Sequence, residues 1–78
     1  MAYAIEQAHN VGIDSTIFCR LIDVESGWQT DVVSPAGAVG IAQIEPKWHP
    51  AVDPTDPWAS LRYAAGLIRN YLDEYNGN

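Results

Sequence analysis

The residue whose type and position most clearly predict chemistry in this sequence is Glu25. The apolar residues before it follow the three- and four-residue spacing of one helical face: Ile17, Phe18, Leu21 and Ile22. The same spacing continues to Glu25, which lies three residues after Ile22 and four after Leu21. Ionisable side chains are rarely buried without a partner. Glu25 is therefore either a paired structural charge or a working acid whose pKa an apolar setting raises.

Composition restricts the chain to one small, acidic domain. It has 78 residues, of which 47% are hydrophobic and 18% charged, and this is typical of a folding sequence rather than a disordered one. The net charge of −6 disfavours binding to nucleic acid or to an anionic membrane by general electrostatics. Cys19 is the single cysteine, so no intrachain disulfide is available. His9 has no second metal ligand at a suitable spacing, and we expect neither a metal nor another cofactor.

Two helices are predicted in the first third of the chain. The first begins at Ala2 and ends near His9. The second is predicted over Ser15–Ser26, with Asp14 as its N-cap and Gly27 as a left-handed C-terminal residue. Glu25 then lies in the last turn, where the negative end of the helix dipole also favours the protonated acid.

The third helix is predicted to be the longest element, with about 18 or 19 residues. Asp56 is its N-cap, Pro57 takes the first helical position, and Gly77 closes it. Its apolar stripe is expected to be core and consists of Trp58, Leu61, Ala65, Ile68, Leu72 and Tyr75. Arg62 and Arg69 lie off this stripe, so we expect them to be solvated or ion-paired.

A long irregular loop is expected between the second and third helices. Residues 45–57 hold four of the five prolines and predict a stiff connection. Residues 38–44 are apolar and could form a strand. Gly40 and Ala42 instead favour a tightly packed short helix or a close backbone approach.

Several side chains of this loop allow two interpretations each. Considered alone, Ser34 before Pro35 is a turn-forming serine, and Gln43 is a lone exposed amide. Trp48 and His49 could line a sugar-binding rim; equally, Trp48 could cover the core.

Two sequence blocks carry a family resemblance. Residues 25–28 read ESGW, and residues 34–44 read SPAGAVGIAQI, with Pro46 soon after. Together they resemble the lytic transglycosylase family related to the catalytic domain of the soluble bacterial enzymes, within the lysozyme-like superfamily. Residues 56–75 resemble the long helix that follows in this family. The resemblance covers residues 14–75 and implies a small all-α, lysozyme-like domain, which we expect to span residues 1–78.

The resemblance implies that Glu25 cleaves the MurNAc–GlcNAc β-1,4 bond of peptidoglycan. It would first protonate the leaving oxygen and then act as base on the C6 hydroxyl of MurNAc, giving a 1,6-anhydro ring without a second carboxylate. Ser34 would hydrogen-bond near Glu25 or the substrate N-acetyl group, and Gln43 would contact sugar. The residues that would let the backbone approach the glycan are Gly40, Ile41 and Ala42.

The sequence departs from the family pattern in two places. Glu45 stands where the family often has an apolar residue, and it either faces solvent or is a second carboxylate that favours hydrolysis. The family also carries an Ala-Tyr-Asn-Ala-Gly segment well beyond the long helix. Residues 75–77 look like this motif but come too early, so we expect the domain to lack that segment or to be a minimal form.

The leading hypothesis is a lytic transglycosylase that acts on peptidoglycan strands. Alternatives are a lysozyme-type muramidase, a non-catalytic glycan-binding remnant of the fold, and a purely structural helical module. We expect no membrane association, because no apolar run approaches the roughly 18 residues of a membrane span. Residues 1–10 do not resemble a signal peptide, so we expect another route of delivery to the cell wall. The expected place of action is the cell wall, as a monomer or within a larger cell-wall or phage assembly that delivers the domain.

Overall fold

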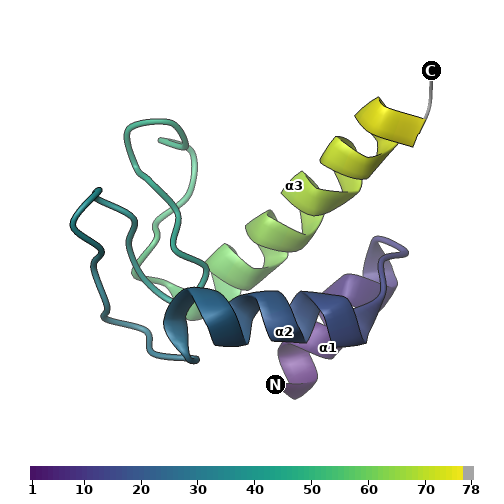
Figure 1. Ribbon diagram of the computed structural model, residues 1–78, viewed down its shortest axis with the longest axis horizontal. Coiled ribbons are helices and arrows are strands. Elements are labelled where there is room, and N and C mark those ends of the chain that lie inside the picture. The colour runs from purple at the N-terminus through teal and green to yellow at the C-terminus, as the bar shows by residue number, and fades with distance from the viewer. Residues whose placement is uncertain (77–78) are drawn as a thin grey trace.

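The computed structural model describes residues 1–76 and contains three helices joined by a short turn and a long loop (Figure 1). These are α1 (Ala2–Asn10), α2 (Ser15–Ser26) and α3 (Pro57–Asn76). Within residues 1–76 the only β pairing consists of isolated bridges in the loop. The predicted all-α class is therefore confirmed. No helix in the described part of the chain is both long and apolar enough to cross a membrane.

Both ends of α2 lie where the sequence predicts them. The Asp14 carboxylate accepts a hydrogen bond from the backbone nitrogen of Ile17 at 3.0 Å, which satisfies one of the unpaired donors of the first turn. Gly27 ends the helix with φ of 61°, a left-handed conformation in which a Cβ is unfavourable. Local sequence thus fixes how far α2 extends before the chain reverses.

The beginning of α3 also follows its local sequence. The Asp56 side chain accepts hydrogen bonds from the backbone nitrogens of Trp58 and Ala59, at 3.0 and 3.1 Å. Pro57, which has no backbone N–H to leave unpaired, takes the first helical position. The predicted cap is confirmed, whereas the predicted closing residue Gly77 lies outside the described residues.

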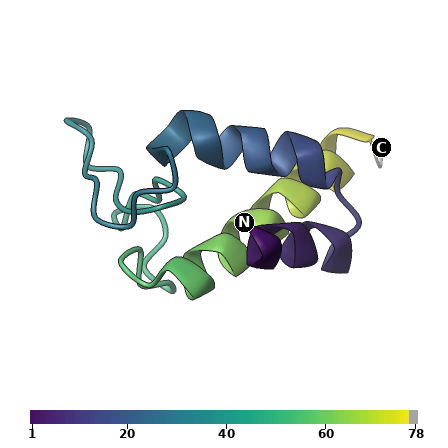
Figure 2. The same ribbon diagram turned by 90° about the horizontal axis from the view of Figure 1, so that it is seen from below.

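The core forms where α1 packs against both α2 and α3 (Figure 2). Its buried residues come from all three helices and from the loop: Ala4, Ala8, Phe18, Ile22, Ile41, Leu61 and Ala65. The α1 contribution is alanine only, and these small side chains allow the helices to approach closely. Ile41 brings the loop into the same core, so the loop is anchored to the helices from the inside.

The apolar stripe of α3 is core over only half of its length. Leu61 and Ala65 are buried, but Trp58, Leu72 and Tyr75 are exposed, so the prediction is wrong at these positions. Leu72 and Tyr75 are exposed because they lie in the second half of α3, where this helix diverges from α2 (Figure 1). Trp58, in the first turn, meets the Tyr3 ring edge to face and stays 58% exposed. The described part of the chain therefore leaves apolar surface uncovered along the second half of α3.

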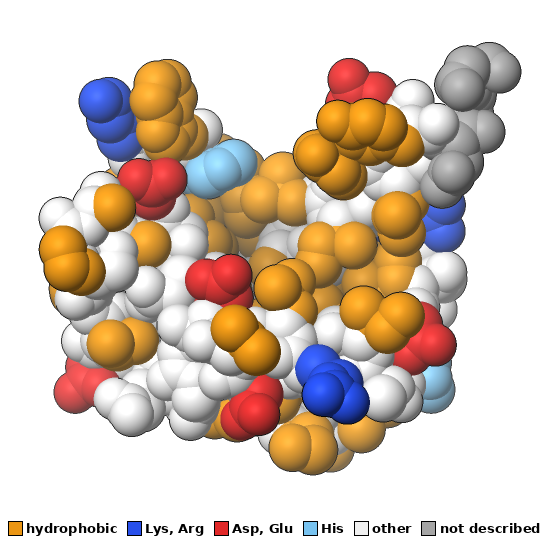
Figure 3. Space-filling view, in the orientation of Figure 1, with side chains coloured by type: hydrophobic (Ala, Val, Ile, Leu, Met, Phe, Trp, Pro, Cys, Tyr) orange, Lys and Arg blue, Asp and Glu red, His pale blue; other side chains and the backbone are white. Residues whose placement is uncertain are grey.

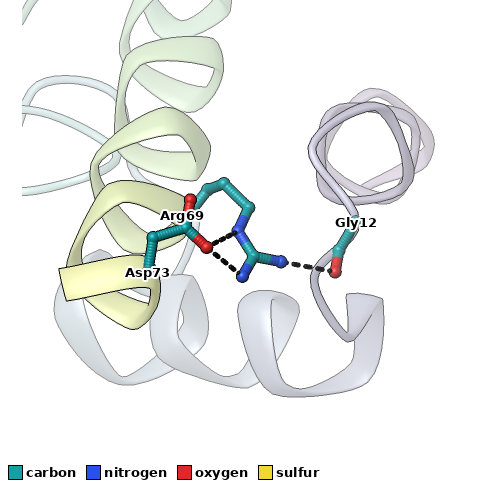
Figure 4. Close-up of polar contacts among 3 residues, drawn as sticks. All are labelled: Gly12, Arg69 and Asp73. Carbon is teal, nitrogen blue, oxygen red and sulfur yellow. Dashed lines mark hydrogen bonds and ion pairs between the residues drawn. The ribbon is translucent and has the colours of Figure 1, made fainter. Parts of the chain in front are cut away.

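Arg69 connects α3 to the turn between α1 and α2 (Figure 4). Its Nε and Nη2 donate to the Asp73 carboxylate at 3.1 and 2.5 Å, and Nη1 donates to the carbonyl of Gly12 at 3.2 Å. Of the two states expected for Arg69, solvated or ion-paired, the ion-paired one is confirmed. Arg62 is exposed, and its guanidinium reaches the Tyr3 hydroxyl at 3.5 Å.

Residues 38–44 form neither the strand nor the short helix considered above. They make a tight turn in which Val39 pairs with Val33 on one side and with Ile44 on the other. The remaining alternative, a close backbone approach, is the correct one, and its partner is described below.

Candidate active site

Glu25 lies in the last turn of α2, as predicted, but its side chain is exposed. The buried face of α2 repeats every four residues and consists of Phe18, Ile22 and Ser26. Ile17 and Leu21, eight and four residues before Glu25, are 68% and 38% exposed. The prediction that the buried face continues to Glu25 is therefore wrong, because the face ends one residue later, on Ser26.

Ser26 is a buried structural residue beside Glu25 that the sequence analysis missed. Its side chain is 6% exposed, and its hydroxyl lies 2.5 Å from the carbonyl oxygen of Ile41 and 3.2 Å from that of Ile22. A hydroxyl has one proton, so the shorter contact is the main hydrogen bond. The oxygen also accepts from the backbone nitrogen of Trp28 at 3.1 Å. Ser26 therefore fixes the end of α2, and with it Glu25, against residue 41 of the loop.

Ser34 forms a turn. Its hydroxyl accepts a hydrogen bond from the backbone nitrogen of Ala38 at 3.1 Å, and its own backbone nitrogen donates to the Ala38 carbonyl at 2.8 Å. The contacts shown are thus those of the turn-forming interpretation. They shape the start of the loop segment that follows.

The close approach predicted for Gly40 is confirmed, although its partner is the protein itself. Gly40 is buried with φ of 80°, and a Cβ there would overlap the carbonyl of Pro54. Gln43 is not a lone exposed amide, since its Nε2 donates to the carbonyls of Val32 and Gly40 at 3.2 and 2.9 Å. Ile41 belongs to the core. These three residues hold the loop in shape.

A groove of about 180 Å³ lies between the loop and α3, and Figure 3 shows the surface hollowed there above apolar side chains. It is lined by Ala42, Gln43, Ile44, Glu45, His49, Ala64, Leu67 and Ile68. Of the predicted site residues, the groove brings together Ala42, Gln43 and Glu45. The predicted site residues outside its lining are Glu25, Ser34, Gly40 and Ile41.

The loop rim of the groove carries its polar groups. The backbone nitrogen of His49 donates to the carbonyl of Glu45 at 3.1 Å, which closes one turn and places both residues at the groove. The imidazole Nδ1 of His49 is hydrogen-bonded to the Tyr63 hydroxyl at 2.9 Å. Trp48 is 64% exposed, with the Lys47 ammonium 5.0 Å from its ring centre. The interpretation in which Trp48 covers the core is therefore wrong.

Within the described residues, neither Glu25 nor Glu45 forms an ion pair. Residues 1–76 bring no three His, Cys, Asp or Glu side chains together in a way that could hold a metal ion. The chemistry that this arrangement offers is that of isolated carboxyl groups, with Glu25 at the helix end and Glu45 in the groove.

Comparison with known proteins places these features in a family. No solved structure matches the chain significantly. The family model of the transglycosylase SLT domain matches residues 2–78, which is almost the whole chain. The chain therefore belongs to the transglycosylase SLT domain family, the lysozyme-like, all-α lytic transglycosylases that cleave peptidoglycan.

Proposed function

We propose that this domain cleaves the MurNAc–GlcNAc β-1,4 bond of peptidoglycan with Glu25 as its single catalytic group. The observation that carries the proposal is the hydrogen bond between Ser26 and Ile41. It joins the ESGW block at the end of α2 to the SPAGAVGIAQI block of the loop, and this contact supports a single site made from the two blocks. Glu25 precedes this contact by one residue and is open to a ligand.

The reaction needs a proton donor and then a proton acceptor on the same carboxyl group. Glu25 gives its proton to the glycosidic oxygen as the bond from that oxygen to C1 of MurNAc breaks. The C6 hydroxyl of the same sugar then bonds to C1, and its proton returns to the Glu25 carboxylate. No water is consumed, and the product ends in a 1,6-anhydro ring. A second carboxylate, which most glycosidases use, is not required.

The bound glycan completes the surroundings of Glu25. Water around a carboxyl group weakens the electrostatic interactions that catalysis uses, and binding of substrate removes that water. Leu21, one turn before Glu25 on the same exposed face, offers apolar surface for the sugar to cover. We infer that the site is assembled by the substrate as much as by the protein.

The loop residues divide into two roles in this proposal. Ala42, Gln43 and Glu45 line the groove and contact the glycan, with the Gln43 carbonyl oxygen as an acceptor for a sugar hydroxyl. Ser34, Gly40 and Ile41 act by fixing the loop, because their contacts in the described residues are internal.

A second candidate function is lysozyme-type hydrolysis. The observation that favours it is the position of Glu45 in the groove, where a second carboxylate could activate water. Under the main proposal Glu45 binds substrate only. Glu45→Gln would then lower the rate without changing the products, whereas under hydrolysis it would abolish turnover.

Digestion of purified sacculi tests the proposal. The wild type should release soluble fragments, and Glu25→Gln should lower the rate by roughly 10²–10⁴-fold, the usual value of acid–base catalysis. Glu6→Gln is the matched control, because Glu6 is an exposed glutamate of α1, and it should be as active as the wild type. If Glu25→Gln keeps the wild-type rate, the assignment of Glu25 is wrong.

Action on peptidoglycan implies that the domain works at the cell wall. Delivery by a phage particle, and assembly into a larger cell-wall or virion complex, stay predictions. Isolation of the protein from purified particles, or from the periplasmic and wall fractions of the producing cell, would test them.

A further inference from the structure

We propose that Glu45 and His49, with Tyr63 behind them, form a recognition site for the acetamido group of an amino sugar. The inference rests on the proposed glycan-cleaving function and adds a specificity for that same groove. Its starting point is that two polar residues of one turn, Glu45 and His49, line a groove whose α3 side is apolar and consists of Ala64, Leu67 and Ile68.

The backbone fixes Glu45 and His49 relative to each other. The His49 nitrogen donates to the Glu45 carbonyl at 3.1 Å, so the two residues are the ends of a single helical turn. Both side chains are half-buried, and both line the groove. The spacing between them is therefore set by the chain and does not depend on a ligand.

Tyr63 fixes the imidazole of His49 from the side of α3. Its hydroxyl lies 2.9 Å from Nδ1, and the two rings meet edge to face with their centres 5.5 Å apart. When the hydroxyl donates its proton to Nδ1, the ring proton is on Nε2. No described residue accepts a hydrogen bond from Nε2. In this tautomer Tyr63 is a positioning residue, and the Nε2–H of His49 is a donor for a ligand in the groove.

An acetamido group complements this arrangement part by part. Its N–H is a donor for the Glu45 carboxylate, and its carbonyl oxygen is an acceptor for His49 Nε2–H. Its methyl group fits the apolar surface that Ala64, Leu67 and Ile68 provide on α3. A sugar hydroxyl at the same position has no methyl group for the apolar surface and no carbonyl oxygen to accept from His49.

Binding of two neutral tetrasaccharides to the Glu25→Gln protein tests the inference. Chitotetraose carries acetamido groups, and cellotetraose has hydroxyls in their place. Chitotetraose should bind more tightly, with NMR shifts at His49 and Tyr63. Adding His49→Ala should weaken chitotetraose binding by about 3–10-fold, the value of one hydrogen bond, and leave cellotetraose binding unchanged. Tyr63→Phe keeps the ring and should lower the ratio of chitotetraose to cellotetraose affinity by a smaller factor.

Two variants separate recognition from folding. His49→Gln keeps an Nε donor and should retain most of the preference for chitotetraose. His9→Ala removes the other histidine, which is exposed on α1, and should leave the ratio unchanged. The inference is overturned if His49→Ala and Tyr63→Phe, each added to Glu25→Gln, leave the ratio of chitotetraose to cellotetraose affinity unchanged. This holds even when the wild type degrades sacculi. If these two variants lower the preference for chitotetraose but the wild type cleaves no sacculi, the recognition site is supported and the proposed function is contradicted.

Discussion

The hydroxyl of Ser26 and the carbonyl of Ile41 lie 2.5 Å apart, and this hydrogen bond joins the last turn of α2 to the loop. Neighbouring residues of one helical turn thus have opposite tasks. Ser26 points into the core and carries the structural contact, whereas Glu25 is exposed and free to meet a glycan. The position of the proposed acid therefore depends on the serine that follows it.

Ser26→Ala should destabilise the protein and lower its activity together. The substitution leaves the Ile41 carbonyl without this buried partner and removes the acceptor for the Trp28 nitrogen, which costs about 1–3 kcal/mol. Urea unfolding measures this cost. Thr16→Ala, at an exposed position of the same helix, is the control and should cost less than about 0.5 kcal/mol. Equal stability of the two variants would contradict the role of Ser26.

Gly40→Ala should cost much more than Gly37→Ala. Both glycines have a left-handed φ, of 80° and 95°, so an alanine at either position incurs about 1–2 kcal/mol of backbone strain. Only at Gly40 does the new Cβ also overlap a carbonyl, that of Pro54, which adds about 1–3 kcal/mol. The difference between the two free energies of unfolding isolates this overlap. A difference of zero would show that the loop does not pass this close to Pro54.

The Asp53 carboxyl should titrate below its usual range. Hydrogen bonds from the Thr55 hydroxyl and backbone nitrogen lower the pKa of Asp53 below 3.8. Because the pKa is lower in the folded protein, the charged carboxylate stabilises this turn above pH 3.8, and the stabilisation is lost as the pH falls through the lowered pKa. NMR titration of the Asp53 side chain measures the midpoint. Thr55→Val should move the pKa back toward 3.8, and no movement would refute the assigned cause.

Arg69→Ala should destabilise the protein more than Asp73→Ala. The ion pair of these residues lies on the exposed side of α3, so its loss alone costs about 0.2–0.5 kcal/mol and diminishes with added salt. Arg69 also donates to the Gly12 carbonyl, and losing this link between α3 and the α1–α2 turn adds about 0.5–1.5 kcal/mol. Thermal unfolding at low and high salt separates the two parts. Equal effects of the two substitutions would mean that the contact with Gly12 contributes nothing.

Local signals predicted the helices, because caps and breakers act within a few residues. Asp14 and Gly27 bound α2 as expected, and Asp56 begins α3. Local signals did not determine which face of α2 is buried. The series Ile17, Leu21, Glu25 and the series Phe18, Ile22, Ser26 are both spaced by four residues, and packing against α1 selects the second.

Contacts between distant residues could not be predicted. Gly40 predicts a close approach of another backbone segment, but the segment that approaches it contains Pro54, fourteen residues away in the sequence. His49 and Tyr63 are separated by the same number, and only the course of the loop brings them together. The residues of the family blocks were therefore identified from sequence, while their division into loop-shaping and groove-lining residues required the structure.

Mass spectrometry of the fragments released from sacculi tests the central claim most directly. Transglycosylation by Glu25 alone consumes no water, so every new MurNAc end should be a 1,6-anhydro sugar, one water lighter than a reducing end. These products should disappear with Glu25→Gln and persist with Glu45→Gln. Reducing ends in place of anhydro ends, or anhydro products that survive Glu25→Gln, would contradict the account.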